Sequence, residues 1–182
     1  TVLGAAAAAG AADSIDELFP AGLDADGAAA PDGATSLHIA ARHGQERAVE
    51  ALVRGGADVD ATDDAGATPL HAAAAASTSE AATSAASSLI RHSAAADARD
   101  HLGRTPLHLA LGAQNFSLAR ELLSNGARAD ILAPDGASPL WMSRALEAPA
   151  QSDAGVGTGL SLATDASAVD GVVDLFPPPL RG

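Results

Sequence analysis

A short phrase recurs along this chain at nearly constant intervals, and this internal repeat constrains the fold more than any other feature. Four clear copies read TSLHIAA, TPLHAAA, TPLHLAL and SPLWMS, and a degenerate fifth, TVLGAAA, precedes them. They begin at Thr1, Thr35, Thr68, Thr105 and Ser138, so successive phrases lie 34, 33, 37 and 33 residues apart. A period of this length predicts a solenoid of small stacked units.

A second signature follows the phrase at a fixed offset. Leu52-Val53 precede the run GADVD at 56–60, and Leu122-Leu123 precede GARAD at 126–130. With both signatures, the chain resembles the ankyrin-repeat family along nearly its whole length. The resemblance implies an all-α solenoid of about five helix–loop–helix units with short hairpin-like loops, which acts as a protein-binding module. The expected units are 1–34, 35–67, 68–104, 105–137 and 138–182, the last with a flexible insertion at about 149–166.

The second unit shows the expected local structure best. Thr35 can cap a helix that carries Leu37, Ala40 and Ala41 on one face, and Gly44 ends it. The next helix is expected from about Glu46 to Arg54, with its apolar residues at the same i, i+3, i+4 spacing.

Two outer helices carry a possible capping box, in which two side chains each satisfy a free backbone N–H. Ser14 and Glu17 fit this pattern in the first unit, where Pro20 then ends the helix. Ser77 and Glu80 fit it in the third unit, which is four residues longer than the second. Four residues make about one helical turn, so we expect a longer outer helix over about 78–91. The alternative is a loose, phosphorylatable loop over the Ser-rich run at 77–88.

The last unit is interrupted after its inner helix. A glycine-rich stretch over 149–159 has the composition of a flexible loop, and a helical pattern returns at 168–176 before three prolines. We interpret 168–176 as a displaced outer helix that closes the stack. Trp141 replaces the histidine of the phrase, and we expect it to pack against its neighbour. The chain begins without Met, directly on a phrase, so further repeats are expected upstream.

Composition excludes several classes of function. The formal net charge is −13 and every basic residue is an arginine, which argues against nucleic acid as the main partner. There is no cysteine, and no apolar stretch approaches the roughly 20 residues that span a bilayer. The charge is compatible with a basic protein partner, but we favour the simpler interpretation that many of the acids are turn residues whose side chains bond nearby backbone. These turn acids are Asp26, Asp32, Asp60, Asp97, Asp130 and Asp135.

Three histidines occupy one position in successive phrases: His38, His71 and His108. Stacked helices lie about 8–10 Å apart, whereas zinc needs its nitrogens within about 2.1 Å, so this spacing argues against a metal site. The resemblance implies a structural role, in which each histidine bonds to the Thr of its phrase and to the adjoining turn. We expect no metal, no cofactor and no catalytic group, because no known catalytic motif appears on a recognisable scaffold.

The candidate partner-binding residues lie at the hairpin tips and at the end of one inner helix. Arg42 and His43 lie near the end of the inner helix of the second unit, a position that the resemblance to ankyrin repeats places on the concave face. The equivalent positions are Ala75-Ala76 and Gly112-Ala113, which makes that face chemically poor. The hairpin tips carry more charged and hydrogen-bonding side chains than this face does. The full candidate set is Asp32, Arg42, His43, Asp64, Asp100, His101, Arg104 and Asp135.

The sequence therefore predicts a monomeric, non-enzymatic module that binds a protein partner, with no contact to nucleic acid or membrane. Binding would use the hairpin tips and the concave face of the inner helices. The alternative is a regulatory or substrate-recruiting segment of a larger enzyme or ubiquitin-ligase-type assembly.

Overall fold

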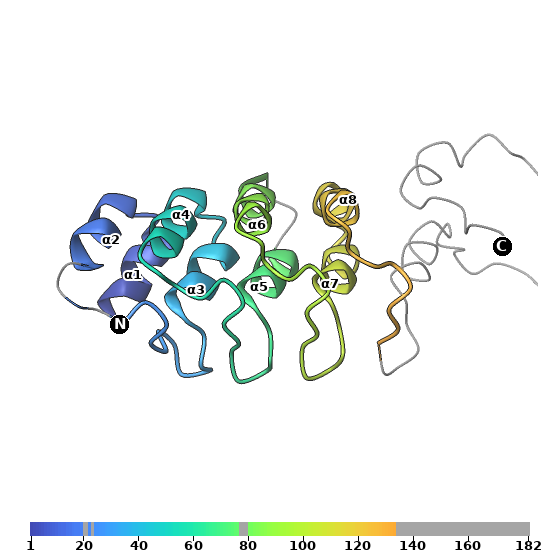
Figure 1. Cartoon of the computed structure of the whole chain (residues 1–182), viewed down its shortest axis with the longest axis horizontal. Coiled ribbons are helices and arrows are strands. Elements are labelled where there is room, and N and C mark those ends of the chain that lie inside the picture. The colour runs from blue at the N-terminus through green and yellow to red at the C-terminus, as the bar shows by residue number, and fades with distance from the viewer. Residues whose placement is uncertain (20–21, 23, 77–79, 134–182) are drawn as a thin grey trace, which may run out of the picture.

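In the computed structural model, residues 1–19, 22, 24–76 and 80–133 are described. They form eight α-helices in four antiparallel pairs that stand in a row (Figure 1). The inner helices are α1 (Val2–Ala9), α3 (Ser36–Arg42), α5 (Pro69–Ala75) and α7 (Pro106–Gly112). The outer helices are α2 (Ala12–Leu18), α4 (Glu46–Arg54), α6 (Glu80–Arg91) and α8 (Phe116–Ser124). Long loops between the pairs project to one side of the row. The fold is the expected all-α solenoid.

Each inner helix packs against the inner helices of the neighbouring pairs, and each outer helix does the same in its own layer. The core between the layers is built from fully buried leucines at equivalent positions, surrounded by alanines. Leu37, Leu70 and Leu107 lie on the inner helices, and all three are 0% exposed. Because a buried leucine contributes about 1.5–3 kcal/mol and an alanine much less, these leucines supply most of the stabilisation.

The degenerate first phrase forms a helix, as the phrases at Thr35, Thr68 and Thr105 do, with Thr1 as its cap. The Thr1 side chain accepts a hydrogen bond of 3.1 Å from the backbone N–H of Gly4. Gly4 stands where the later phrases have histidine, and a Cβ on it would lie 2.9 Å from the Ala29 methyl. The following loop therefore lies too close for any side chain at this position.

The predicted capping box of Ser14 and Glu17 is wrong. The helix α2 begins at Ala12, and its first hydrogen bond runs from the N–H of Ile15 to the carbonyl of Ala11. The turn from α1 takes only Gly10 and Ala11, with Gly10 in the left-handed conformation. Ser14 therefore already lies inside the first helical turn and cannot cap it.

The outer helix of the third unit is longer than its neighbours, as predicted. The helix α6 has 12 residues, whereas α4 and α8 have nine each. Its first turn lies over the α3–α4 loop, where a Cβ on Gly44 would come within 2.7–2.8 Å of the Ala81 and Ala82 backbone. The loop interpretation is thus wrong for residues 80–88.

Several predictions fall outside the described residues. They concern the stop at Pro20, the Ser77 cap, the contact residue Asp135, Trp141, the insertion at about 149–166 and the closing helix at 168–176.

Polar contacts join the outer helices along the stack. Arg54 of α4 contacts Asp16 of α2 at 3.1 Å, and Arg91 of α6 contacts Glu46 and Glu50 of α4 at 3.0 and 3.1 Å. These ion pairs are exposed, so water and salt screen them and they contribute little to stability. They align the outer layer more than they stabilise it.

Candidate protein-binding surface

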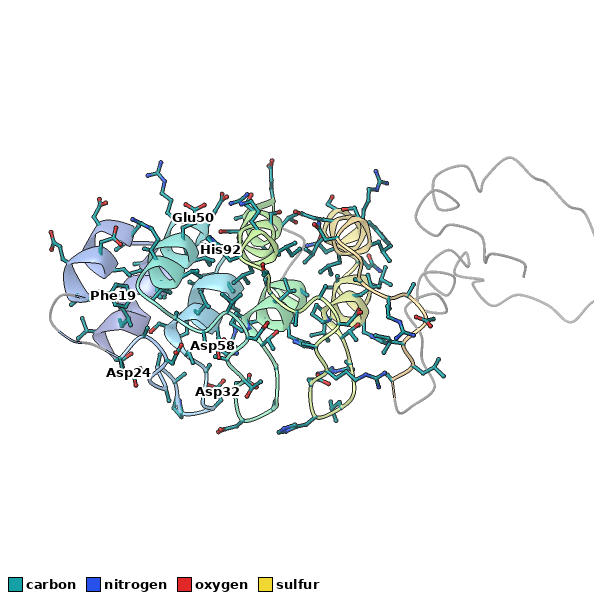
Figure 2. The ribbon with its side chains drawn as sticks, viewed as in Figure 1. Phe19, Asp24, Asp32, Glu50, Asp58 and His92 are labelled. Carbon is teal, nitrogen blue, oxygen red and sulfur yellow. The ribbon has the colours of Figure 1, made fainter. Side chains whose placement is uncertain are left out.

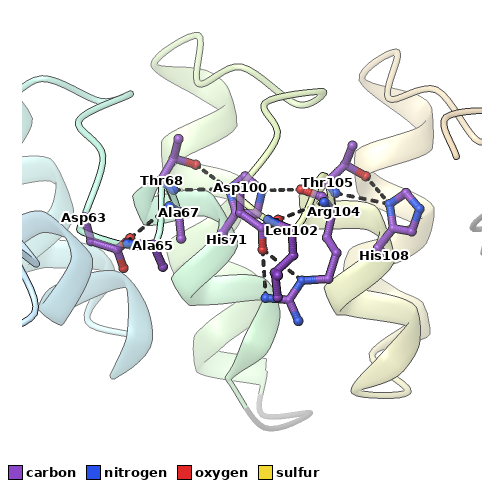
Figure 3. Close-up of polar contacts among 10 residues, drawn as sticks. All are labelled: Asp63, Ala65, Ala67, Thr68, His71, Asp100, Leu102, Arg104, Thr105 and His108. Atoms are coloured by element: carbon purple, nitrogen blue, oxygen red, sulfur yellow. Dashed lines mark hydrogen bonds and ion pairs between the residues drawn. The ribbon is translucent and has the colours of Figure 1, made fainter. Parts of the chain in front are cut away.

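The three histidines of the phrase hold each inner helix to the next loop. The backbone N–H of Thr68 donates to Nδ1 of His71 at 3.2 Å, and the Thr68 hydroxyl lies 2.9 Å from the same nitrogen (Figure 3). The proton is therefore on Nε2, which donates to the carbonyl oxygen of Arg104 at 3.0 Å. His38 repeats the arrangement, with Nε2 donating to the carbonyl of Ala67 at 2.8 Å. The implied structural role is confirmed for these two histidines.

Burial favours the neutral form of these imidazoles. Desolvation lowers the pKa of His38 and of His71 below the ordinary value of 6.5, although the backbone carbonyl that each one contacts opposes this change. Both nitrogens of His71 are engaged in the structure, so this side chain is not free to act as a general base.

The loops before Thr68 and Thr105 are tight hairpins organised by one aspartate each. Asp63 Oδ1 accepts hydrogen bonds of 2.9 Å from the N–H groups of Ala65 and Ala67. Asp100 Oδ1 does the same for Leu102 and Arg104, at 3.0 and 2.8 Å. These bonds fix the shape of each hairpin from within.

Adjacent hairpin tips are also joined through their backbones. The N–H of Asp64 donates to the carbonyl of Asp32 at 3.0 Å, and the N–H of His101 donates to the carbonyl of Ala65 at 2.9 Å. The three tips therefore form one continuous edge, on which side chains are held at defined positions.

Asp100 and Arg104 were expected at the tips, and the structure places them differently from the others. The Asp100 side chain is only 2% exposed, and its Oδ2 accepts from Arg104 Nε and Nη2 at 2.8 and 2.7 Å. Burial alone would raise the pKa of the Asp100 carboxyl, but hydrogen bonds from the Arg104 side chain and backbone outweigh it and hold the pKa below its ordinary value. Both oxygens of this carboxylate therefore accept hydrogen bonds within the hairpin.

The remaining candidates among the described residues are exposed. Asp32, Asp64 and His101 lie at successive tips, and Asp32 is visible on its loop in Figure 2. Arg42 and His43 lie at the end of α3, and the Arg42 guanidinium is 4.0 Å from Asp32 Oδ2. That distance is the outer limit of an ion pair, so both groups remain available to a partner.

A hollow of about 340 Å³ lies between the hairpins and the inner helices, over α5. Its floor is formed by Ala72, Ala75 and Ala76, and Leu109 of α7 borders it. Arg42 and Arg104 also line the hollow. Ala75 and Ala76 stand at the positions where the second unit has Arg42 and His43, so two long side chains are replaced by methyl groups there.

Sequence reasoning identified Ala75-Ala76 as a chemically poor part of the concave face but missed that they form a concavity. The sequence does carry a signal for this concavity, because two long side chains of the second unit are replaced by alanines in the third. Ala65 and Ala67, which the hairpin contributes to the lining, gave no such signal.

The return-loop acids were expected to bond nearby backbone, and for three of them this is wrong. Each of these carboxylates accepts an N–H from the return loop of the next repeat, at 2.8–2.9 Å. The pairs are Asp26 with Asp58, Asp60 with Ala95, and Asp97 with Arg128. Asp32 does bond locally, to the N–H of Ala34 at 3.3 Å. The three cross-repeat acids thus join adjacent units and are not free contact groups.

Within the described ranges, no group of three or more His, Cys, Asp or Glu side chains could hold a metal ion. Over the same residues, no helix has the length and apolar character needed to cross a bilayer.

A stack of helix pairs joined by hairpins defines a helical repeat protein. Comparison with known proteins specifies the family. A model of three ankyrin-repeat copies matches residues 3–84, and a single ankyrin-repeat model matches residues 102–142. The chain belongs to the ankyrin-repeat family.

One relative is the Neurogenic locus Notch protein of Drosophila melanogaster, which is 42% identical over 65 residues. The match covers 36% of this chain and 2% of that protein, so the chain corresponds to a small part of it. Ankyrin repeats are in general protein–protein interaction modules and are typically non-enzymatic, and protein binding is therefore the general role of this fold.

Proposed function

We propose that this chain is a non-enzymatic module that binds one protein partner along the edge of its hairpin tips and the adjoining concave face. The observation that carries the proposal is the rigid edge itself. Asp32, Asp64 and His101 are exposed on tips that are joined by backbone hydrogen bonds. Preorganised side chains lose little conformational entropy on binding, which favours affinity.

The net charge supports a basic partner. At −13, the chain attracts a positively charged surface, and such steering raises association rates. The carboxylates of Asp32 and Asp64 are the contacts that we assign to it. Asp100 and Arg104 serve this surface indirectly, because their ion pair, in which the Asp100 carboxylate is buried, holds the hairpin in shape.

The state of the titratable groups at the concave face supports a non-enzymatic role. His71 and Asp100 line the hollow, but each is engaged in hydrogen bonds that hold the fold. A general base needs a free lone pair directed at its substrate, which neither of these groups offers.

The test is a comparative pull-down with the full chain as bait. The double variant Asp32→Asn/Asp64→Asn removes two charges from the tips, and Asp13→Asn/Glu17→Gln removes two exposed charges from α2 as a matched control. We expect a partner whose capture falls at least tenfold with the tip variant and stays constant with the control. Purified partner must then bind the chain directly. Equal capture by both variants, or a loss confined to the α2 variant, would contradict the proposal.

The alternative, a recruiting or regulatory segment of a larger enzyme or ubiquitin-ligase-type assembly, stays a prediction. The small share of the Notch protein that matches supports it, because these repeats occur there within a much longer chain. The full-length reading frame tests it: a catalytic or ligase-associated domain in the same chain would support this role, and its absence would remove it.

A further inference from the structure

We infer that the hollow over α5 takes a bulky apolar side chain from an extended segment of the partner, and that a basic residue beside this anchor contacts Asp32 and Asp64. The inference rests on the proposed protein-binding function and names the chemistry of the segment that binds.

The lining of the hollow favours an apolar group. Ala72, Ala75 and Ala76 present methyl groups, and Leu109 adds an apolar side. At about 340 Å³, the hollow is at the lower end of the range for ligand pockets, which suits a single large side chain. Because these residues make part of the hollow apolar, an apolar side chain placed there would be partly removed from water, which is favourable.

Apart from Arg42, the polar side chains that line the hollow are already engaged in hydrogen bonds within the fold. His71 donates to the Arg104 carbonyl, and the Asp100 carboxylate is held by Arg104 (Figure 3). Asp63 Oδ1 is held by two backbone N–H groups of its own hairpin. A polar side chain that does not reach Arg42 would therefore lose its water without gaining full replacement, which costs free energy.

The charges beside the hollow favour a basic neighbour of the anchor. The Asp64 carboxylate lies against the tip of the preceding hairpin, where a Cβ on Gly33 would be 2.5 Å from Asp64 Oδ1. Asp64 also donates its N–H to the carbonyl of Asp32, so the two acids sit on adjacent tips. Arg42 lines the hollow and lies 4.0 Å from Asp32, too far to neutralise it strongly. Two carboxylates with one weakly paired arginine leave a net negative edge.

Arg42 gives the inference a specific consequence. If the partner places a basic residue at this edge, Arg42 repels it, and Arg42→Gln should tighten binding about two- to threefold. If the partner is acidic at this point, the same substitution should weaken binding, because Arg42 would then be its ion-pair partner.

The experiment is a selection of random dodecapeptides displayed on phage against the full chain, followed by fluorescence anisotropy with the selected peptides. We expect enrichment of a large aliphatic or aromatic residue next to Arg or Lys. Ala75→Leu fills the hollow, and it should lower affinity at least tenfold. Ala9→Leu is the matched control, since Ala9 is an exposed residue at the end of α1, and it should change nothing.

Each result decides between defined outcomes. Peptides that lose affinity with Asp32→Asn/Asp64→Asn but not with Ala75→Leu would overturn the anchor and leave the proposed function standing. Enrichment of Asp or Glu, with weaker binding to Arg42→Gln, would overturn the basic neighbour. Peptides whose binding is unaffected by the tip variant and by Ala75→Leu alike would contradict both this inference and the proposed binding surface.

Discussion

The second and third repeats start alike, with a Thr–His pair at the beginning of the inner helix, but they end differently. The inner helix of the second repeat is followed by His43 in a near-helical conformation (φ −87°, ψ 1°), and Arg42 and His43 project there. In the third repeat, Ala76 is extended (φ −65°, ψ 154°), and the outer helix that follows has 12 residues instead of nine. The shared residues hold the stack together, and the differing residues shape the hollow.

The largest effects should come from the core that both repeats share. Leu52→Ala, Leu89→Ala and the equivalent Leu122→Ala should each lower the free energy of unfolding by about 2–5 kcal/mol, because all three side chains are 0% exposed. Leu102→Ala is the control, since Leu102 is 61% exposed at a hairpin tip, and it should cost less than about 0.5 kcal/mol. Urea denaturation measures these values. If Leu89→Ala unfolds at the same urea concentration as the parent chain, the register that we assign to the third repeat is wrong.

This shared core is the part that sequence alone predicts well. The apolar spacing identifies α3 and α4, and the bounds of α4 agree with the prediction at both ends. The local sequence misleads at Ser14, because a Ser followed three residues later by Glu signals a cap only if the chain is not already helical. The burial of Asp100 could not be predicted either, since it depends on Arg104 folding back across its own hairpin.

The contact between the two repeats gives the next largest effect. Gly44→Ala adds a methyl within 2.7–2.8 Å of the α6 backbone, at a φ of 68° that disfavours any side chain. We expect a loss of about 2–4 kcal/mol in thermal or urea unfolding. Gly56→Ala is the matched control, because its φ is also positive but nothing lies within 4 Å of the added methyl. It should cost about 1 kcal/mol. Equal losses would mean that α6 does not press on the α3–α4 loop.

Acid should weaken both repeats through their buried histidines. Burial lowers the pKa of His71 in the folded state, so the unfolded chain binds more protons once the pH falls below about 6.5. This contribution to stability is fully present above pH 6.5 and is lost as the pH falls toward the folded-state pKa. The hydrogen bond to the Arg104 carbonyl and the charges of Asp100 and Asp63 oppose the lowering of this pKa, and the charge of Arg104 adds to it. The lowered pKa of Asp100 changes the free energy of unfolding only below about pH 3.8. The effects of His71 and Asp100 on stability therefore fall in different pH ranges.

The measurement is urea denaturation between pH 7.5 and 5.0 for the parent chain and for His71→Gln. We expect the parent to lose stability more steeply than the variant over this range. Parallel curves would show that His71 does not remain neutral in the folded repeat.

The smallest expected effect concerns the end of the outer helices. Ser93 adopts a φ of 66° in the third repeat, at the position where the second repeat has Gly56. Ser93→Gly should therefore raise the free energy of unfolding by about 0.5 kcal/mol, through relief of backbone strain. Ser124→Gly, at the last residue of α8, should lower it by a similar amount. A destabilised Ser93→Gly would contradict the left-handed turn.

The central claim is that the concave face over α5, where the third repeat departs from the second, receives the partner. The most direct measurement is an NMR spectrum of the full chain labelled with 13C at its alanine methyls, with and without a peptide selected against it. We predict that the methyl signals of Ala72, Ala75 and Ala76 shift on binding, whereas those of Ala5 and Ala9 on α1 do not. Shifts confined to the outer helices, or unchanged signals from α5 with the peptide bound, would contradict the claim.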